Sequence, residues 1–556
     1  MEMGAMNLEG TEDTVLQSFG WDWHLTWDTP RLQYTPEQMV EMSQWVVNTK
    51  QAMEGQAIQS ELPPVDLNLL RANDMQWAAY CTVERHWTAL QASRTDAIPP
   101  PSPLRLLISG TAGTGKTFLI RALSQLLGDH CIRTATTGMA AILIAGMTIH
   151  SAAALPIAGR ARTQGDLRGE RLNKLQSTFR DKDYLILDEM SMIGQTSFGH
   201  LDNRLREATG AKDDVFGGLS IILVGDFGQL APVGDLPLYV PAGRSHVAQI
   251  GRAAYVQIKD VIFLTQVERQ GGDSPEQQQW RATLGRIHDG EGTLEDWNLL
   301  RSRQPHIVSN LKDWEEAPRL WFAWADVNNY NYYKLRELGS PVVKIEAQHG
   351  GGRRAEIATE DKAHGLQKEM FLAVGAKVFL TWNLWQQANL VNGMNGVVVD
   401  LVFDENSPPP ALPIAVMVDF PNYIGPPFLP DHPTYVPISP QYAEWMEGPR
   451  PLSKTQIPLR LSWAFTIYKS QGQTIRKAMI HLGNREQQSG ATFVALSRLR
   501  RLEDGVIEQF PFEHLEAMRR HRNLQARRRE EARLQALAEI TLRSLQEVDD
   551  GAGPSN

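Results

Sequence analysis

The sequence predicts an α/β protein with parallel β-sheets and several domains, and three observations support this fold class. The chain has 556 residues, which is too long for a single hydrophobic core. Short apolar runs at Leu104–Ser109, Tyr184–Glu189 and Leu219–Asp226 alternate with helical patterns, as in strands that are covered on both faces. A glycine-rich loop, Gly110–Thr117, joins the first of these runs to a helical pattern over Thr117–Leu127.

Composition restricts the class of protein further. The net charge of −9 argues against a protein that coats nucleic acid with its whole surface, although a local basic groove remains compatible with it. No run of about 18 apolar residues occurs, so we expect no membrane partner. The acidic start, MEMGAMNLEGTEDT, has no apolar segment, so we expect no secretory or organellar signal. Cys81 and Cys131 alone make neither a disulfide framework nor a zinc cage, which favours a reducing compartment.

Shifts in pattern along the chain predict five segments. A helical pattern over Leu67–Ala92 precedes a stiff proline stretch, Ile98–Pro103, and strand-like runs with proline clusters mark a small β-rich insert. The predicted segments are an N-terminal extension (1–65), a first α/β domain (66–260), a second α/β domain (261–374 and 458–510), the β-rich insert (375–457) and a charged helical tail (511–556). In the extension, we expect Trp21, Trp23 and Trp27 to be buried against a neighbouring domain.

The tail is predicted to be one long helix over Phe512–Leu545, because it contains little glycine or proline. Its first half is basic and its second half has a Leu/Ile stripe. A solvated or packed helix is the ordinary interpretation of such a pattern, and contact with DNA is the alternative. The basic residues are Arg519, Arg520, Arg522, Arg527, Arg528 and Arg529.

The glycine-rich loop GTAGTGKT matches the phosphate-binding pattern G-x-x-x-x-G-K-[ST], with a strand pattern before it and a helical pattern after it. Glycines let backbone N–H groups turn towards phosphates, and the helix N-terminus adds partial positive charge. Lys116 is expected to reach the β- and γ-phosphates and Thr117 to bind Mg²⁺. The candidate nucleotide-binding residues are Gly110, Thr111, Ala112, Gly113, Thr114, Gly115, Lys116 and Thr117.

A phosphate-binding loop needs a carboxylate at the end of a neighbouring strand. Asp188 follows the apolar run YLIL and is expected to hold Mg²⁺ together with Thr117. Glu189 beside it is placed to orient or deprotonate the attacking water. These residues by themselves predict hydrolysis of ATP or GTP and nothing more specific.

Six further motifs, read in chain order, resemble those of the Pif1-like DNA helicases, relatives of RecD within helicase superfamily one, over roughly Leu67–Val506. The resemblance implies two RecA-like domains, an SH3-like insert at 375–457 and a strand-separating wedge in Gly159–Arg180. The motifs are Ala135–Ser151, Ser197–Ala208, Phe216–Val233, Phe263–Gln270, Leu461–Ile475 and Phe493–Arg500.

The same resemblance implies roles around the nucleotide. Gln229 would sense the γ-phosphate, Arg269 and Arg498 would be arginine fingers from the second α/β domain, and Gln76 would read adenine. Together with Lys116 and Glu189, the first three are the candidate catalytic residues. The chain departs from the family pattern at two positions. Phe493 stands where tyrosine is usual, and Glu268 replaces an apolar residue.

The resemblance also implies contacts to DNA, from hydroxyl and amide groups that hold phosphates. His150 taken alone would more often be a structural histidine. The basic residues of the wedge segment are Arg160, Arg162, Arg168, Arg171 and Lys174, for which a solvated basic loop is the alternative. The candidate DNA-binding residues are Thr136, Thr137, Thr148, His150, Lys469, Ser470 and Gln471.

The expected protein is therefore a DNA helicase that uses ATP and Mg²⁺, acts on single-stranded and forked DNA, and moves 5′ to 3′ because the relatives do. The resemblance implies a role in DNA repair, recombination or telomere maintenance, and the substrate favours a nuclear location. One alternative is a catalytically inert DNA-binding relic of a Helitron-type mobile element, although the His-x-His motif of the associated nuclease is absent from the sequence. The other is a P-loop ATPase switch that does not translocate. No pattern indicates the oligomeric state.

Overall fold

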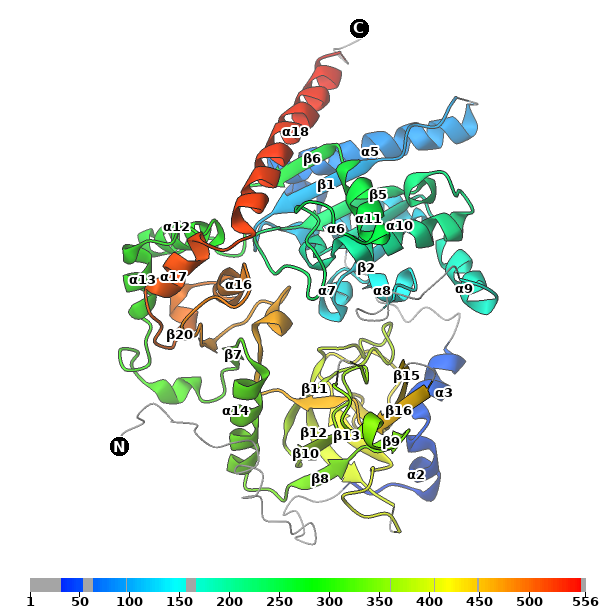
Figure 1. Ribbon diagram of the computed structural model, residues 1–556, viewed down its shortest axis with the longest axis vertical. Helices are drawn as coiled ribbons and strands as arrows, with labels where there is room; N and C mark the ends of the chain where they lie inside the picture. The colour runs from blue at the N-terminus through cyan, green and yellow to red at the C-terminus, as the bar shows by residue number, and fades with distance from the viewer. Residues whose placement is uncertain are drawn as a thin grey trace. The chain divides into compact units, whose positions relative to one another are not determined.

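The chain forms two compact units, which a computed structural model describes over residues 32–53, 64–96, 98–156, 167–360, 362–404, 406–447 and 450–551 (Figure 1). The β-rich unit comprises Met1–Ser60 and Glu315–Lys469, and the parallel-sheet unit comprises Glu61–Trp314 and Ser470–Asn556. The predicted burial of Trp21, Trp23 and Trp27 falls outside the described residues. None of the helices in these ranges combines the length and apolar composition that crossing a bilayer requires.

The parallel-sheet unit is built on a six-stranded sheet whose neighbouring strands all run parallel. The strand order is β3-β2-β4-β5-β1-β6, and the three apolar runs of the sequence form β1, β4 and β5. This sheet confirms the predicted α/β class. The strands are β1 (Arg105–Gly110), β2 (Cys131–Ala135), β3 (Met147–Thr148), β4 (Tyr184–Asp188), β5 (Ser220–Gly225) and β6 (Asp260–Leu264).

Helices cover both faces of this sheet, because alternate strand residues point to opposite faces. Leu106 and Ile108 of β1 join a core with α5 and α6, whereas Leu107 between them joins a second core with α10 and the C-terminal helix. Both cores are almost completely buried, which explains why the strands are continuous apolar runs. The helices are α5 (Asp74–Thr95), α6 (Lys116–Leu127), α10 (Gln195–Thr209) and α11 (His246–Val256).

Two sequence-based boundaries are corrected by the structure. The first α/β domain was expected to end at residue 260, but β6 (Asp260–Leu264) crosses that point and pairs with β1. An apolar run specifies a strand, but not the sheet that the strand joins. The helix expected over Leu67–Ala92 is divided into α4 (Leu67–Arg71) and α5, because the Asn73 side chain accepts a hydrogen bond from Gln76 N and starts a new helix. The remaining domain division stays a proposal.

The tail is a packed helix rather than a solvated one, and it forms two helices, α17 (Glu513–Arg519) and α18 (Leu524–Gly551). Leu534 and Ala538 of α18 belong to the second core, beside β6 (Figure 1). The Thr541 hydroxyl accepts a 3.1 Å hydrogen bond from Val261 N of β6. The tail is therefore part of the parallel-sheet unit. This unit also contains α12 (Pro275–His288), α13 (Leu294–Arg301), α16 (Ala491–Ser497) and the parallel pair β19 (Ala478–Ile480) and β20 (Gly505–Ile507).

The β-rich unit is centred on a five-stranded antiparallel sheet, which confirms the β-rich character of the insert. Helices α2 (Pro36–Met42) and α3 (Trp45–Ala52) of the N-terminal extension pack on its core through Met42 and Trp45. In order, the sheet contains β14 (Tyr435–Ile438), β13 (Ala415–Asp419), β12 (Asn395–Val402), β11 (Lys377–Leu380) and β17 (Leu459–Leu461).

Smaller elements complete this unit. Beside the central sheet lie a three-stranded antiparallel sheet and two strand pairs, one antiparallel and one parallel. The elements are β15 (Gln441–Glu447), β16 (Arg450–Gln456), β9 (Gln348–Gly350), β10 (Glu369–Leu372), β8 (Val343–Glu346), β7 (Arg319–Trp321), β18 (Ala464–Thr466) and α14 (Trp324–Glu337).

The packing of α18 predicts an asymmetric effect of two substitutions on one helix. Leu534 is 1% exposed and Ile540 is 62% exposed. We expect Leu534→Ala to lower the free energy of unfolding by about 2–5 kcal/mol, because it leaves a cavity in the core. Ile540→Ala should change it by less than about 0.5 kcal/mol. Urea unfolding of both variants measures the difference, and equal effects would contradict the packed position of the tail.

Candidate nucleotide site

The loop Gly110–Thr117 has the backbone conformation that a phosphate-binding loop requires. Gly113 and Gly115 have φ of +89° and +79°, a region that residues with a Cβ rarely adopt. A Cβ at Gly115 would lie 2.4 Å from Gln76 Nε2, and one at Gly113 would lie 2.6 Å from Arg269 Cβ. The positive φ therefore favours glycine at both positions, and at Gly113 the close approach of Arg269 Cβ also disfavours a larger residue.

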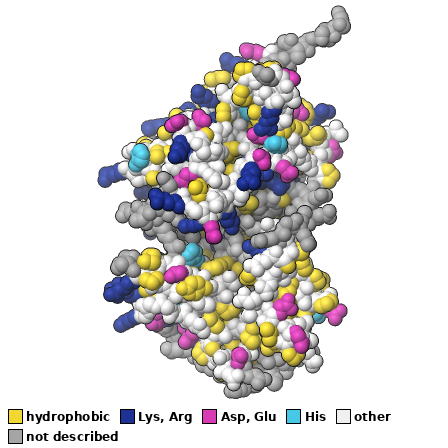
Figure 2. Space-filling view, turned by 90° about the vertical axis from the view of Figure 1, so that its right-hand side faces the viewer, with side chains coloured by type: hydrophobic (Ala, Val, Ile, Leu, Met, Phe, Trp, Pro, Cys, Tyr) yellow, Lys and Arg dark blue, Asp and Glu magenta, His cyan; other side chains and the backbone are white. Residues whose placement is uncertain are grey.

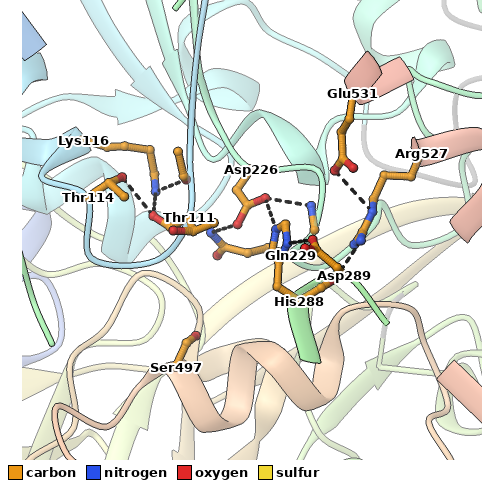
Figure 3. Close-up of polar contacts among 12 residues, drawn as sticks. Thr111, Thr114, Lys116, Asp226, Gln229, His288, Asp289, Ser497, Arg527 and Glu531 are labelled. Carbon is orange, nitrogen blue, oxygen red and sulfur yellow. Dashed lines mark hydrogen bonds and ion pairs between the residues drawn. The ribbon is translucent and has the colours of Figure 1, made fainter. Parts of the chain in front are cut away.

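Lys116 lies inside the curve of this loop. Its Nζ donates hydrogen bonds of 2.7 Å to Gly110 O and 2.8 Å to Thr111 O (Figure 3). Burial lowers the pKa of Lys116, while the carboxylates of Glu189, Asp226 and Asp188 oppose that shift. The ammonium group is therefore held where a phosphate-binding loop places its lysine.

The two candidate carboxylates stand at the end of the central strand β4. Asp188 Oδ1 accepts a 2.8 Å hydrogen bond from Glu189 N, and both residues are buried. Burial, together with the charge of Glu189, raises the pKa of Asp188. Glu189 adopts φ +54°, a left-handed conformation that is uncommon for residues other than glycine. Mg²⁺ prefers oxygen ligands. The buried Asp188 carboxylate and the hydroxyl of Thr117, at the start of α6, are ligands of this kind.

Two arginines approach the same loop from later in the chain. Arg269 follows β6, and its backbone N donates a 3.0 Å hydrogen bond to Gly113 O. Its Nη1 donates to Ser497 O, next to Arg498. Both guanidinium groups interact electrostatically with Glu189.

Arg498 is 1% exposed, and burial lowers its pKa to about 9. Its guanidinium group donates only to backbone carbonyls and to the Ser497 hydroxyl. Within the described residues, neither Arg498 nor Arg269 forms an ion pair with a carboxylate. A buried cation without a counter-ion is costly, so this arrangement fits an anionic ligand such as a phosphate group.

Gln229 lies on the loop after β5, as its predicted role requires. Its Nε2 donates a 3.2 Å hydrogen bond to Asp226 Oδ2, and its backbone N donates to Asp226 O. Figure 3 shows this loop beside Thr111 and Lys116. Gln76 contacts the phosphate-binding loop, where its Nε2 donates to Thr114 O at 3.1 Å. All the candidate catalytic residues therefore gather in the parallel-sheet unit.

The predicted DNA-binding residues have different surroundings. Thr136 Oγ1 donates to Glu189 O at 3.1 Å, and Gln471 Nε2 donates to Glu189 Oε2 at 3.0 Å. The hydroxyls of Thr137 and Thr148 cap helices α7 (Gly138–Leu143) and α8 (Ile149–Ala152). Of these four residues, only Thr136 and Gln471 therefore contact Glu189, the candidate general base.

The other predicted DNA-binding residues are less informative. Burial lowers the pKa of His150, and Ser470 is fully buried. Lys469, at the end of the β-rich unit, donates to Asn392 Oδ1 at 2.8 Å, and burial lowers its pKa to about 8. The DNA-binding roles stay predictions.

The predicted wedge is only partly described. Arg160 and Arg162 lie outside the described residues, while Arg168, Arg171 and Lys174 are exposed at or beside α9 (Glu170–Phe179). On the face in Figure 2, basic and acidic side chains are interspersed. This mixture agrees with the net negative charge and argues against a uniformly basic surface.

Sequence reasoning missed several residues that surround the site. His288 at the end of α12 bonds to Asp226, and Arg527 of α18 bonds to His288 O. Asn73 Nδ2 donates to Glu268 Oε1, so the departure from the family pattern at Glu268 has a polar partner. Only Asp226 had a local signal, in the motif GDFGQ. His288, Arg527 and Asn73 have no such local pattern, and only the tertiary structure shows that they lie at the site.

Comparison with known proteins gives a consistent result. A family model described as PIF1-like helicase matches residues 93–295. The human ATP-dependent DNA helicase PIF1 is 31% identical over 401 residues, which cover 72% of this chain and 57% of the human protein. The chain thus spans somewhat more than half the length of the curated relatives it resembles first.

Two solved structures share the fold. The crystal structure of Pif1 helicase from Candida albicans matches with a TM-score of 0.58 and 25% identity, over 81% of this chain and 98% of that one. That of the Bacteroides Pif1 helicase in complex with ADP-AlF3 and ssDNA matches with a TM-score of 0.56 and 25% identity, over 75% and 91%. These matches confirm the expected RecA-like architecture. By sequence, family model and fold alike, this chain is similar to the PIF1-like helicases.

Proposed function

We propose that this chain is an ATP-dependent DNA helicase that translocates on single-stranded DNA and unwinds forked duplex. The observation that carries the proposal is Arg498, a buried guanidinium group that forms no ion pair with a carboxylate of the described residues and interacts electrostatically with Glu189. The backbone N of Arg269 contacts the phosphate-binding loop, and its guanidinium group, a second cation, interacts electrostatically with Glu189. Cations in these positions suit the charge that develops on a transferring phosphoryl group.

Each side chain has a defined task in hydrolysis. Lys116 and the loop amides hold the phosphates, and Gln76 lies where it can bind the adenine of ATP. Glu189 orients the water and accepts its proton, while Arg269 and Arg498 stabilise negative charge in the transition state. Mg²⁺, bound by Thr117 and Asp188, would neutralise charge on the β- and γ-phosphates.

Coupling to DNA is supported by the contacts of Glu189. Thr136 and Gln471 come from two separate segments with predicted DNA contacts, and both donate hydrogen bonds to Glu189. A strand that binds these segments would thus shift the residue that activates water. The Bacteroides relative was crystallised with both ADP-AlF3 and ssDNA, which supports binding of the same two ligands by this chain.

The direction of movement and the site of action follow from the same proposal. We propose 5′ to 3′ movement, on the resemblance to the Pif1-like helicases, and action in the nucleus, on the expected DNA substrate. Thr137, Thr148, His150, Lys469 and Ser470 remain proposed DNA-binding residues.

Removing either arginine should abolish most of the hydrolysis. Arg498→Ala and Arg269→Ala are each expected to lower the DNA-stimulated kcat by about 10³-fold or more, because charge in the transition state loses its partner. Lys116→Ala should be at least as severe. Steady-state phosphate release measures these rates. Arg501→Ala is the control, because Arg501 is exposed and its guanidinium group pairs with Glu503 at the surface. Normal turnover by Arg498→Ala would contradict the proposed role.

Loss of the Gln471 amide should reduce stimulation by DNA. In Gln471→Ala, the ratio of hydrolysis rates with and without single-stranded DNA is expected to fall by about tenfold, because Glu189 loses a hydrogen bond from a DNA-coupled segment. Gln249→Ala, an exposed position on α11, is the control. An unchanged ratio would show that this contact does not transmit DNA binding.

Strand displacement separates the proposed function from its alternatives. Duplexes with a 5′ or a 3′ single-stranded tail are incubated with the full chain, ATP and Mg²⁺, and separated strands are quantified. We expect unwinding of the 5′-tailed duplex only, and its loss with EDTA. Hydrolysis indifferent to DNA without displacement would favour an ATPase switch, and DNA binding without hydrolysis would favour an inert relic.

A further inference from the structure

His288 is a buried histidine with an acidic partner on each ring nitrogen. Its Nε2 lies 2.9 Å from Asp226 Oδ1 and its Nδ1 lies 2.6 Å from Asp289 Oδ1, and its side chain is 10% exposed. Carboxylate oxygens accept hydrogen bonds, so both ring nitrogens must donate and the ring is an imidazolium. Burial alone would lower the pKa of His288, but the two carboxylates outweigh burial and raise it to about 10.

Asp226 connects this cation to the predicted γ-phosphate sensor. Its Oδ1 accepts from His288 and from Gly228 N at 2.8 Å, and its Oδ2 accepts from Gln229 Nε2. The turn and the ring fit closely together, since a Cβ at Gly228 would lie 1.9 Å from His288 Nε2. His288, Asp226 and Gln229 therefore form one connected group (Figure 3).

The C-terminal helix α18 contacts the backbone of His288 and Asp289. Arg527 of α18 is 2% exposed and donates a 2.7 Å hydrogen bond to His288 O. Arg528 donates to Asp289 O, also at 2.7 Å. These carbonyls end helix α12, where cationic groups are favourable. In Figure 3, Arg527 points from α18 towards His288 and Asp289.

The charge of His288 also matters for the nucleotide. Asp226 is a buried anion that interacts electrostatically with Lys116, the expected partner of the γ-phosphate. Without a cation beside it, this carboxylate would compete for Lys116 and repel the incoming phosphate. The imidazolium compensates Asp226 and leaves Lys116 for the nucleotide.

We propose that His288 is a positioning residue for Gln229 and that Arg527 makes helix α18 a working part of the nucleotide site. This inference rests on the proposed ATP hydrolysis and deepens it. The tail then acts on the γ-phosphate step without touching the nucleotide, through the hydrogen bond from Arg527 to His288 O and the contacts of the His288 ring. The proposal predicts that a substitution of His288 or Arg527 selectively lowers the preference for a nucleotide that carries a γ-phosphate.

The test uses the full chain and compares two nucleotides that differ in the γ-phosphate. Dissociation constants of ADP and ATPγS are measured without DNA by displacement of a fluorescent nucleotide, and kcat and KM are measured with DNA. In His288→Gln, ADP affinity should stay within about twofold, while the preference for ATPγS over ADP and the kcat each fall about tenfold. His306→Gln, at an exposed position, is the control.

A second pair of variants leaves His288 in place. Arg527→Gln should shift the same preference in the same direction, whereas Arg529→Gln, exposed on the same helix, should not. Because Arg527 acts through His288, the double variant should lose little more than His288→Gln alone. Gly228→Ala, which keeps every charge but crowds the ring, should reproduce the effect.

Two results would overturn the inference. One is a wild-type ATPγS preference in both His288→Gln and Arg527→Gln, and the other is an equal loss of ADP and ATPγS affinity, which indicates general damage to the fold. Failure of the proposed function looks different: wild-type hydrolysis would ignore single-stranded DNA, while the nucleotide preference would still be measurable.

Discussion

The nucleotide site depends on burying opposite charges together at one edge of a parallel sheet. Lys116, Arg269 and Arg498 are the cations, and Asp188, Glu189 and Asp226 are the anions. None of these charges is stable alone in a low-dielectric interior, so each constrains where the others lie. The anions favour nearby cations and a metal ion. The two arginines, which form no ion pair with a carboxylate of the described residues, favour a phosphate group between them and Lys116.

This balance explains why the site is assembled from distant segments. The phosphate-binding loop and β4 supply Lys116 and the carboxylates locally, but the arginines come from segments after β6 and at the end of α16. Gln471 and Thr136 then hold Glu189 from two further segments. Because Glu189, the candidate general base, accepts hydrogen bonds from Gln471 and Thr136, a movement of either residue would directly affect the hydrolysis step. In the proposed helicase, this arrangement links the DNA strand to ATP turnover.

The two ends of the chain have different structural roles. Residues of α2 and α3 complete the core of the β-rich unit through Met42 and Trp45, so this part of the extension contributes packing. The tail also packs, through Leu534 and Ala538, but its arginines additionally hold the turn that carries His288. Arg527 and Arg528 of the basic first half of the tail donate to carbonyls of the same chain. Arg527 is buried there and is not available to DNA, whereas Arg528 is exposed.

The sequence by itself determined the features that neighbouring residues encode. The phosphate-binding loop, the carboxylates after β4, the apolar strands and the helical tail follow from local spacing and conformation, because glycine geometry and strand burial act over a few residues. Tertiary structure alone decided that β6 belongs to the first sheet and that α18 packs beside it. It also paired His288 with Asp226, 62 positions apart, and with Arg527, 239 positions apart. Such pairs leave no periodic signal, since only packing brings the two segments together.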